Sequence, residues 1–70
     1  MSVLEIGSLI KERRKMLGIT QPNLAEMAEI SINTLYKIET GKANPTLNVT
    51  LKIAQILGLE LKLTVRQPEL

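Results

Sequence analysis

The stretch of residues 21–41 constrains the fold more than any other part of the chain. Apolar residues recur in it at spacings of three and four, which is the period of an α-helix. The pattern changes phase near Glu29, and Ser31 then follows with a hydroxyl that can cap a new helix. We therefore predict two short helices joined by a tight turn.

The chain is short and lacks the residues that cross-link small domains. Its 70 residues make one domain, and a domain of that size buries only about 60% of its unfolded surface. Cysteine, histidine and aspartate are absent, so a disulfide cannot form and structural zinc is not expected. Oligomerisation is the remaining common support for so small a core.

The same missing residues argue against an enzyme. Histidine, cysteine and aspartate supply most nucleophile–base pairs, and the chain has no glycine-rich phosphate loop. We expect neither catalysis nor a cofactor. The net charge of +2 does not by itself imply nucleic acid. No apolar run approaches the roughly 20 residues of a membrane span, and residues 1–10 lack the order of a signal peptide, so we expect a cytoplasmic protein without a membrane partner.

Capping and stop residues bound four predicted helices. The expected ranges are 4–17, 20–28, 31–40 and 47–57. Hydroxyl residues that can act as caps stand at the starts of the last three helices, and glycines follow the first, third and fourth. These residues are Thr20, Ser31 and Thr46 at the starts and Gly18, Gly41 and Gly58 at the ends. Apolar residues at helical spacing are assigned to the core: Ile6, Leu9, Ile10, Met16, Leu17, Leu24, Ala25, Ala28, Leu35, Ile38, Leu47, Leu51, Ile53, Ala54 and Leu57.

The period changes to two after the fourth helix. Leu59, Leu61, Leu63 and Val65 alternate with polar residues, which predicts a half-buried strand over 59–66. Leucine, glutamate and lysine are also good helix formers, so a fifth helix is the alternative. A lone strand has an open edge, and pairing with the same strand of a second copy would close it as an antiparallel dimer ribbon.

The helix at 31–40 has an outward face of unusual composition when Leu35 and Ile38 point inward. Its residues are Ile32, Asn33, Tyr36 and Lys37. Asparagine can pair with an adenine edge, lysine with guanine or phosphate, and an apolar side chain with a thymine methyl group. The alternative is an ordinary solvated face that happens to expose apolar residues.

Several short motifs resemble the Cro/XRE-type helix-turn-helix family. They are Leu17-Gly18-Ile19-Thr20-Gln21, Leu24-Ala25, Ile30-Ser31, Ile38-Glu39, Gly41-Lys42, Asn44-Pro45-Thr46-Leu47 and Lys52-Ile53-Ala54-Gln55-Ile56-Leu57-Gly58. The resemblance covers about residues 6–59. It implies an all-α, four-helix Cro/lambda-repressor-like domain over 4–58, whose second motif helix enters the DNA major groove. The dimerisation strand expected at 59–66 is similar in place and period to that of HipB-type antitoxins.

The resemblance also implies roles for single residues. Gln21 is expected to contact phosphate and help fix the reading helix, while Lys42 and Asn44 approach the DNA backbone. Arg14 and Glu39 match an ion pair between the first and third helices. The implied DNA-contacting set is Gln21, Ile32, Asn33, Thr34, Tyr36, Lys37, Lys42 and Asn44.

Two residues depart from the family pattern. Glu29 stands where the turn usually has glycine, and a left-handed conformation there would cost roughly 1 kcal/mol unless the turn differs. Ile32 replaces a common basic residue, so base readout should be less electrostatic.

These features predict a homodimeric, sequence-specific regulator of transcription, a repressor, bound to double-stranded DNA. Its two reading helices would meet half-sites of a pseudo-palindromic operator about one helical turn, ~34 Å, apart. The alternative is a HipB-type antitoxin that binds a toxin protein and also represses its own operon. RNA binding is disfavoured, because a single tyrosine offers no platform for unstacked bases.

Overall fold

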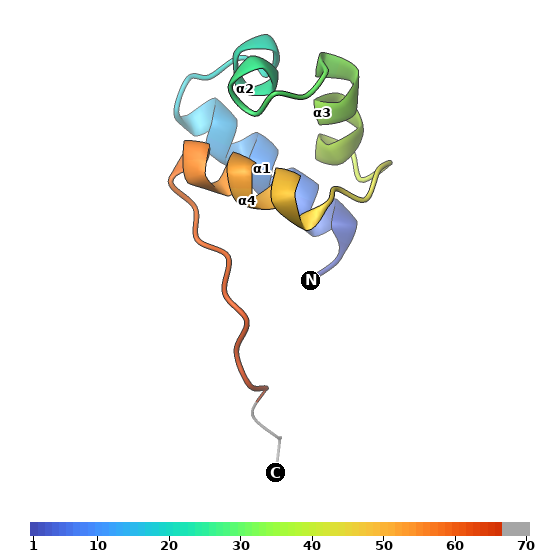
Figure 1. The fold of residues 1–70 in the computed structure, drawn as a ribbon, viewed down its shortest axis with the longest axis vertical. Coiled ribbons are helices and arrows are strands. Elements are labelled where there is room, and N and C mark those ends of the chain that lie inside the picture. The colour runs from blue at the N-terminus through green and yellow to red at the C-terminus, as the bar shows by residue number, and fades with distance from the viewer. Residues whose placement is uncertain (67–70) are drawn as a thin grey trace.

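The computed structural model describes residues 1–66 and contains four helices in that range: α1 (Val3–Met16), α2 (Gln21–Met27), α3 (Ile32–Glu39) and α4 (Leu47–Leu57). Helices α1 and α4 lie side by side, and α2 and α3 cover them on one side (Figure 1). The predicted all-α class and helix order are confirmed, and every helix end lies within one residue of its expected place. None of the helices in residues 1–66 is long and apolar enough to cross a membrane.

Each helix begins at a hydroxyl group that caps it. The side chains of Thr20, Ser31 and Thr46 each accept a hydrogen bond from the backbone amide three residues later. Helix α1 starts one residue earlier than predicted because Ser2 and Glu5 form a capping box. The hydrogen bond from the Ser2 amide holds the pKa of the Glu5 carboxyl below its usual value.

The observed core differs from the predicted core along α1 and α4. The buried apolar residues are Ile10, Leu24, Ala25, Ala28, Leu35, Ile38, Ile53 and Leu57. Five residues predicted inside are exposed instead: Leu9, Met16, Leu17, Leu47 and Leu51. On α4 the side chains of Val49 and Ile56 pack against the core beside Ile53. Helix α4 therefore buries one apolar stripe and leaves Leu47 and Leu51 exposed on a second stripe.

The turn between α2 and α3 passes through Glu29 in the left-handed conformation. Its φ is 58°, and among the residues described no other non-glycine residue has a positive φ. Of the two alternatives that the sequence leaves open, the structure has the left-handed one. The Glu29 carboxylate lies 3.7 Å from the Lys52 ammonium, but both side chains are exposed, so this pair contributes little stability.

Replacing Glu29 by glycine should raise the free energy of unfolding by about 1 kcal/mol, because glycine adopts this conformation without strain. Urea unfolding followed by circular dichroism measures the change. Glu29→Ala is the matched control, since it removes the carboxylate but keeps a Cβ atom at positive φ. If alanine stabilises as much as glycine does, backbone strain is not the cause.

Residues 59–66, called the C-terminal segment below, leave the helical body as an extended chain (Figure 1). The Leu59 amide donates to the carbonyl oxygen of Ala54 at 2.8 Å, which fixes the exit from α4. The alternative of a fifth helix is not seen over 59–66, and no strand is assigned there. A strand needs a neighbouring chain for its hydrogen bonds, so the dimerisation strand stays a prediction.

Candidate nucleic-acid interface

Helix α3 divides into a buried face and an exposed one. Leu35 and Ile38 are 0% and 1% exposed. The opposite side, called the reading face below, consists of Ile32, Asn33, Tyr36 and Lys37, all exposed. Half of the Ile32 side chain and nearly half of Tyr36 are open to solvent. The structure therefore brings an amide, an ammonium group and two apolar surfaces together on one short helix.

A buried polar network fixes the end of α3 to the rest of the domain. The Arg14 guanidinium donates to both carboxylate oxygens of Glu39, at 2.7 Å from Nε and 3.0 Å from Nη2. Its Nη1 donates to the carbonyl oxygen of Ile19 at 2.9 Å. The two charged residues are only 7% and 4% exposed. The structure thus forms the ion pair that the resemblance implied, with the two-point geometry typical of strong arginine–carboxylate pairs.

Gln21 joins this network from the first turn of α2. Its Nε2 donates to Oε1 of Glu39 at 2.9 Å. Because the amide nitrogen carries two hydrogens, one remains for another acceptor. The side chain is half-buried, so it lies at the edge of the domain. Gln21 therefore links α2 to the end of α3, and a phosphate contact from it stays a prediction.

Helix α1 approaches the end of α3 so closely that only glycine fits at the crossing. Gly7 is buried, and a Cβ atom there would collide with the carbonyl oxygen of Ile38. The role of Gly7 is not among those predicted from the sequence. An isolated glycine within a helical pattern, which weakens a helix unless packing requires it, was the available signal.

The loop after α3 is tied back to that helix. The amides of Lys42 and Ala43 both donate to the carbonyl oxygen of Lys37, at 2.8 and 3.2 Å. The Lys42 ammonium lies 5.5 Å from the centroid of the Tyr36 ring, within range of a cation–π contact. Lys42 therefore places a positive charge beside the reading face, and Asn44 is exposed two residues further on.

Thr34 has a different place from the other predicted contact residues. The Thr34 hydroxyl oxygen accepts a hydrogen bond from the Ser31 hydroxyl at 2.8 Å. The Thr34 amide donates to the Ser31 hydroxyl oxygen at 3.0 Å. Thr34 is thus part of the N-terminal cap of α3, although it is exposed. The other predicted residues of α3 form the reading face, and Lys42 lies beside it at the Tyr36 ring.

Two packed helices with a firmly anchored, solvent-facing second helix define the class of helix-turn-helix domains. A helix-turn-helix family model matches residues 10–63 of this chain. The chain therefore belongs to the helix-turn-helix family, and the predicted Cro/XRE-type resemblance is confirmed.

Known proteins are similar in sequence and in fold. An HTH-type transcriptional regulatory protein of Methanocaldococcus jannaschii is 44% identical over 55 residues, which are 79% of this chain and 17% of that protein. An uncharacterized HTH-type transcriptional regulator of Methanothermobacter thermautotrophicus is 42% identical over 53 residues, or 76% of this chain and 77% of that protein. The restriction-modification controller protein C.AhdI of Aeromonas hydrophila has a TM-score of 0.78 at 28% identity, covering 83% of this chain and 88% of that one. The chain spans only about a sixth of the length of the first of these relatives.

Proposed function

We propose that this protein is a sequence-specific DNA-binding regulator of transcription, and that it acts as a repressor. The observation that carries the proposal is the reading face of α3, held in place by the Arg14–Glu39–Gln21 network. A short helix that presents an amide and an ammonium group to solvent from a rigid support suits the major groove. The relatives' names, which describe regulators of transcription, support the same function.

Some of the predicted residues would position the protein on the duplex, and others would read the base sequence. Gln21, which is bonded to Glu39 at the end of α3, and the loop residues Lys42 and Asn44 would contact phosphates, which fixes the protein on the duplex. Asn33 and Lys37 would hydrogen-bond base edges, and Ile32 and Tyr36 would contact thymine methyl groups. Thr34, whose amide is used in the cap of α3, would approach the phosphate backbone with its hydroxyl group.

We also propose that the protein binds as a homodimer to a pseudo-palindromic operator. The C-terminal segment supports this, because Leu63 and Val65 are almost fully exposed and Leu61 is 45% exposed. A two-fold pair would set two reading faces about one helical turn of DNA apart, ~34 Å. The antitoxin alternative has no contact in the structure in its favour and stays a prediction from the sequence.

Asn33→Ala and Lys37→Ala should each weaken binding to the selected operator by roughly 1–3 kcal/mol. Each change removes hydrogen bonds to one base edge, so preference at one base pair per half-site should relax. Fluorescence anisotropy on the operator and on single-base variants measures both effects. Equal weakening on every sequence would remove these residues from the reading role.

Lys42→Ala provides the matched comparison, because it deletes a lysine that lies beside the reading face rather than on it. It should weaken binding to all sequences alike and reduce the salt dependence of log K by about one unit per half-site. An unchanged salt dependence would show that Lys42 makes no phosphate contact. Lys11→Ala, an exposed position on α1, controls for the loss of one positive charge.

A further inference from the structure

Three apolar side chains of the C-terminal segment are exposed to solvent. Leu63 is 100% exposed, Val65 89% and Leu61 45%. Leu59, by contrast, already packs against the chain's own core. The residues that need a cover are therefore the three at positions 61, 63 and 65.

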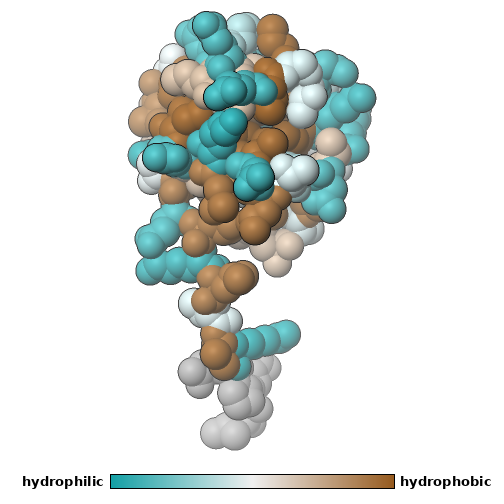
Figure 2. Space-filling view, in the orientation of Figure 1, coloured by the Kyte–Doolittle hydropathy of each residue, from teal (hydrophilic) through white to brown (hydrophobic). Residues whose placement is uncertain are grey.

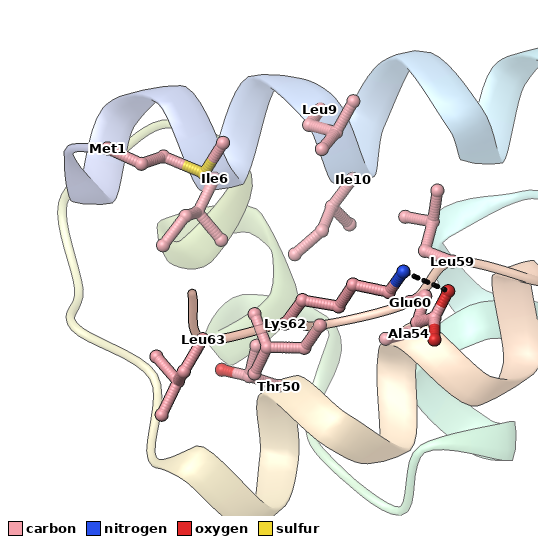
Figure 3. A pocket seen from close by; sticks show the side chains of 11 residues that line it. Met1, Ile6, Leu9, Ile10, Thr50, Ala54, Leu59, Glu60, Lys62 and Leu63 are labelled. Atoms are coloured by element: carbon pink, nitrogen blue, oxygen red, sulfur yellow. Dashed lines mark ion pairs between the residues drawn. The ribbon is translucent and has the colours of Figure 1, made fainter. Parts of the chain in front are cut away.

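The segment also forms one wall of an apolar groove of about 630 Å³ (Figure 3). The other walls come from the N-terminal half of α1 and from α4. The residues outside the segment that line it are Met1, Ile6, Leu9, Ile10, Thr50 and Ala54. In Figure 2 apolar side chains gather over the lower part of the body, where Figure 1 places α4 and the start of the segment. A two-stranded ribbon is marginal alone, and this groove gives its apolar face helices to pack against.

The occupant of the groove that matches the segment best is the same segment of a second copy of this chain. Two identical segments related by a two-fold axis run antiparallel, and directly opposite residues then point to the same face. Apolar residues occupy only the odd positions from 59 to 65. An axis between two residues would set apolar residues opposite polar ones, so the axis must pass through a residue.

Only an axis at one of residues 61 to 64 pairs at least five residues of the segment with its copy, as residues 59–63 are paired by an axis at 61. Charge removes two of these four centres. An axis at Lys62 would place this lysine opposite its own copy. An axis at Thr64 would place Lys62 opposite the partner's Arg66. Like charges directly opposite one another destabilise a sheet. Only Leu61 and Leu63 remain as centres, because each places opposite charges face to face. An axis at Leu61 sets Glu60 opposite the partner's Lys62, and an axis at Leu63 sets Glu60 opposite the partner's Arg66.

Exposure decides between these two centres. With the axis at Leu61, Val65 would lie opposite the partner's Leu57, which is the last residue of α4 and buried, so Val65 would stay uncovered. With the axis at Leu63, Leu61 lies opposite the partner's Val65 and the two Leu63 side chains meet. We infer that the C-terminal segment pairs with that of a second copy in antiparallel register centred on Leu63. The inference rests on the proposed homodimer and specifies its interface.

Single cysteine variants test the register, because the natural chain has no cysteine. Opposite residues of an antiparallel pair have Cα atoms about 4.5–5.5 Å apart, within the range of a disulfide. Under mild oxidation Leu63→Cys should therefore form a covalent dimer. Leu61→Cys should not, because four residues of strand, about 13 Å, would separate it from its own copy. Non-reducing electrophoresis reads out both, and circular dichroism checks that each variant folds.

The outcomes separate the register from the dimer itself. Cross-linking of Leu61→Cys without Leu63→Cys would overturn the register and favour the other centre. A dimer in sedimentation equilibrium that neither cysteine cross-links would place the interface elsewhere. A monomeric natural protein would instead contradict the proposed homodimer.

A charge exchange tests the same register without oxidation. Glu60→Arg should weaken the dimer, because it faces the partner's Arg66 with a like charge. Adding Arg66→Glu should restore dimerisation to near the natural level in sedimentation equilibrium. A double variant as weak as the single one would contradict the Leu63 centre, since with the axis at Leu61 the new arginine faces the partner's Lys62 instead.

Discussion

Glu39→Ala is expected to lower the free energy of unfolding by about 3–5 kcal/mol. The change leaves the Arg14 guanidinium buried without its carboxylate, and it also removes the acceptor of the Gln21 amide. A domain of this length has a total stability of roughly 4–10 kcal/mol, so the variant should be close to unfolding. Urea titration followed by circular dichroism measures the loss.

A double variant separates the cost of an unpaired charge from the value of the pair itself. Arg14→Met with Glu39→Leu removes both charges and keeps similar volume. Replacing a buried ion pair by apolar residues is often neutral or stabilising, so the double variant should be clearly more stable than Glu39→Ala. If it is as unstable as the single variant, the pair itself supplies the stability. In the expected case the double variant stays folded, and its operator binding should still fall because the pair orients α3.

Gly7→Ala should destabilise the domain by about 2 kcal/mol, although alanine favours a helix by roughly 1 kcal/mol over glycine. The added methyl group would overlap the carbonyl oxygen of Ile38, so α1 and the end of α3 must move apart. Overpacking of this kind typically costs about 1–3 kcal/mol, occasionally more. Thermal and urea unfolding measure the loss, and reduced operator affinity of the folded fraction would report the displaced reading face.

Ser8→Ala is the matched control, since Ser8 is the next residue of α1 and is exposed. It also raises helix propensity, although by less than Gly7→Ala, and it introduces no clash, so it should be neutral or slightly stabilising. If Gly7→Ala changes the free energy of unfolding no more than this control does, a methyl group can be accommodated at the crossing. The close approach of α1 would then not fix the position of α3.

Local chemistry explains why the helices could be predicted from the sequence. Each cap depends on one hydroxyl and the amide three residues later, as at Ser31, and such contacts need no distant partner. The left-handed Glu29 is also local, because the turn between two short helices dictates its φ. The capping box at Ser2 and Glu5 was equally readable as a serine followed by glutamate three residues later, but it was missed.

Packing explains why part of the core and of the site could not be predicted. Helical spacing cannot distinguish two apolar stripes on one helix. It predicts Leu47 and Leu51 inside, whereas Val49 and Ile56 pack against the core instead. The close crossing at Gly7 depends on where α3 lies, which periodicity does not encode. The Arg14–Glu39 pair joins residues 25 positions apart, and only the family resemblance indicated it.

Selection of bound sequences from random duplex DNA tests the central claim most directly. The protein as a whole should enrich a pseudo-palindrome whose half-sites have centres about 10–10.5 base pairs apart, because two α3 helices related by two-fold symmetry read one face of the duplex. The Asn33→Ala protein should lose preference at one base pair of each half-site. Absence of any enriched sequence, or enrichment that survives unchanged in variants of the reading face, would contradict the account.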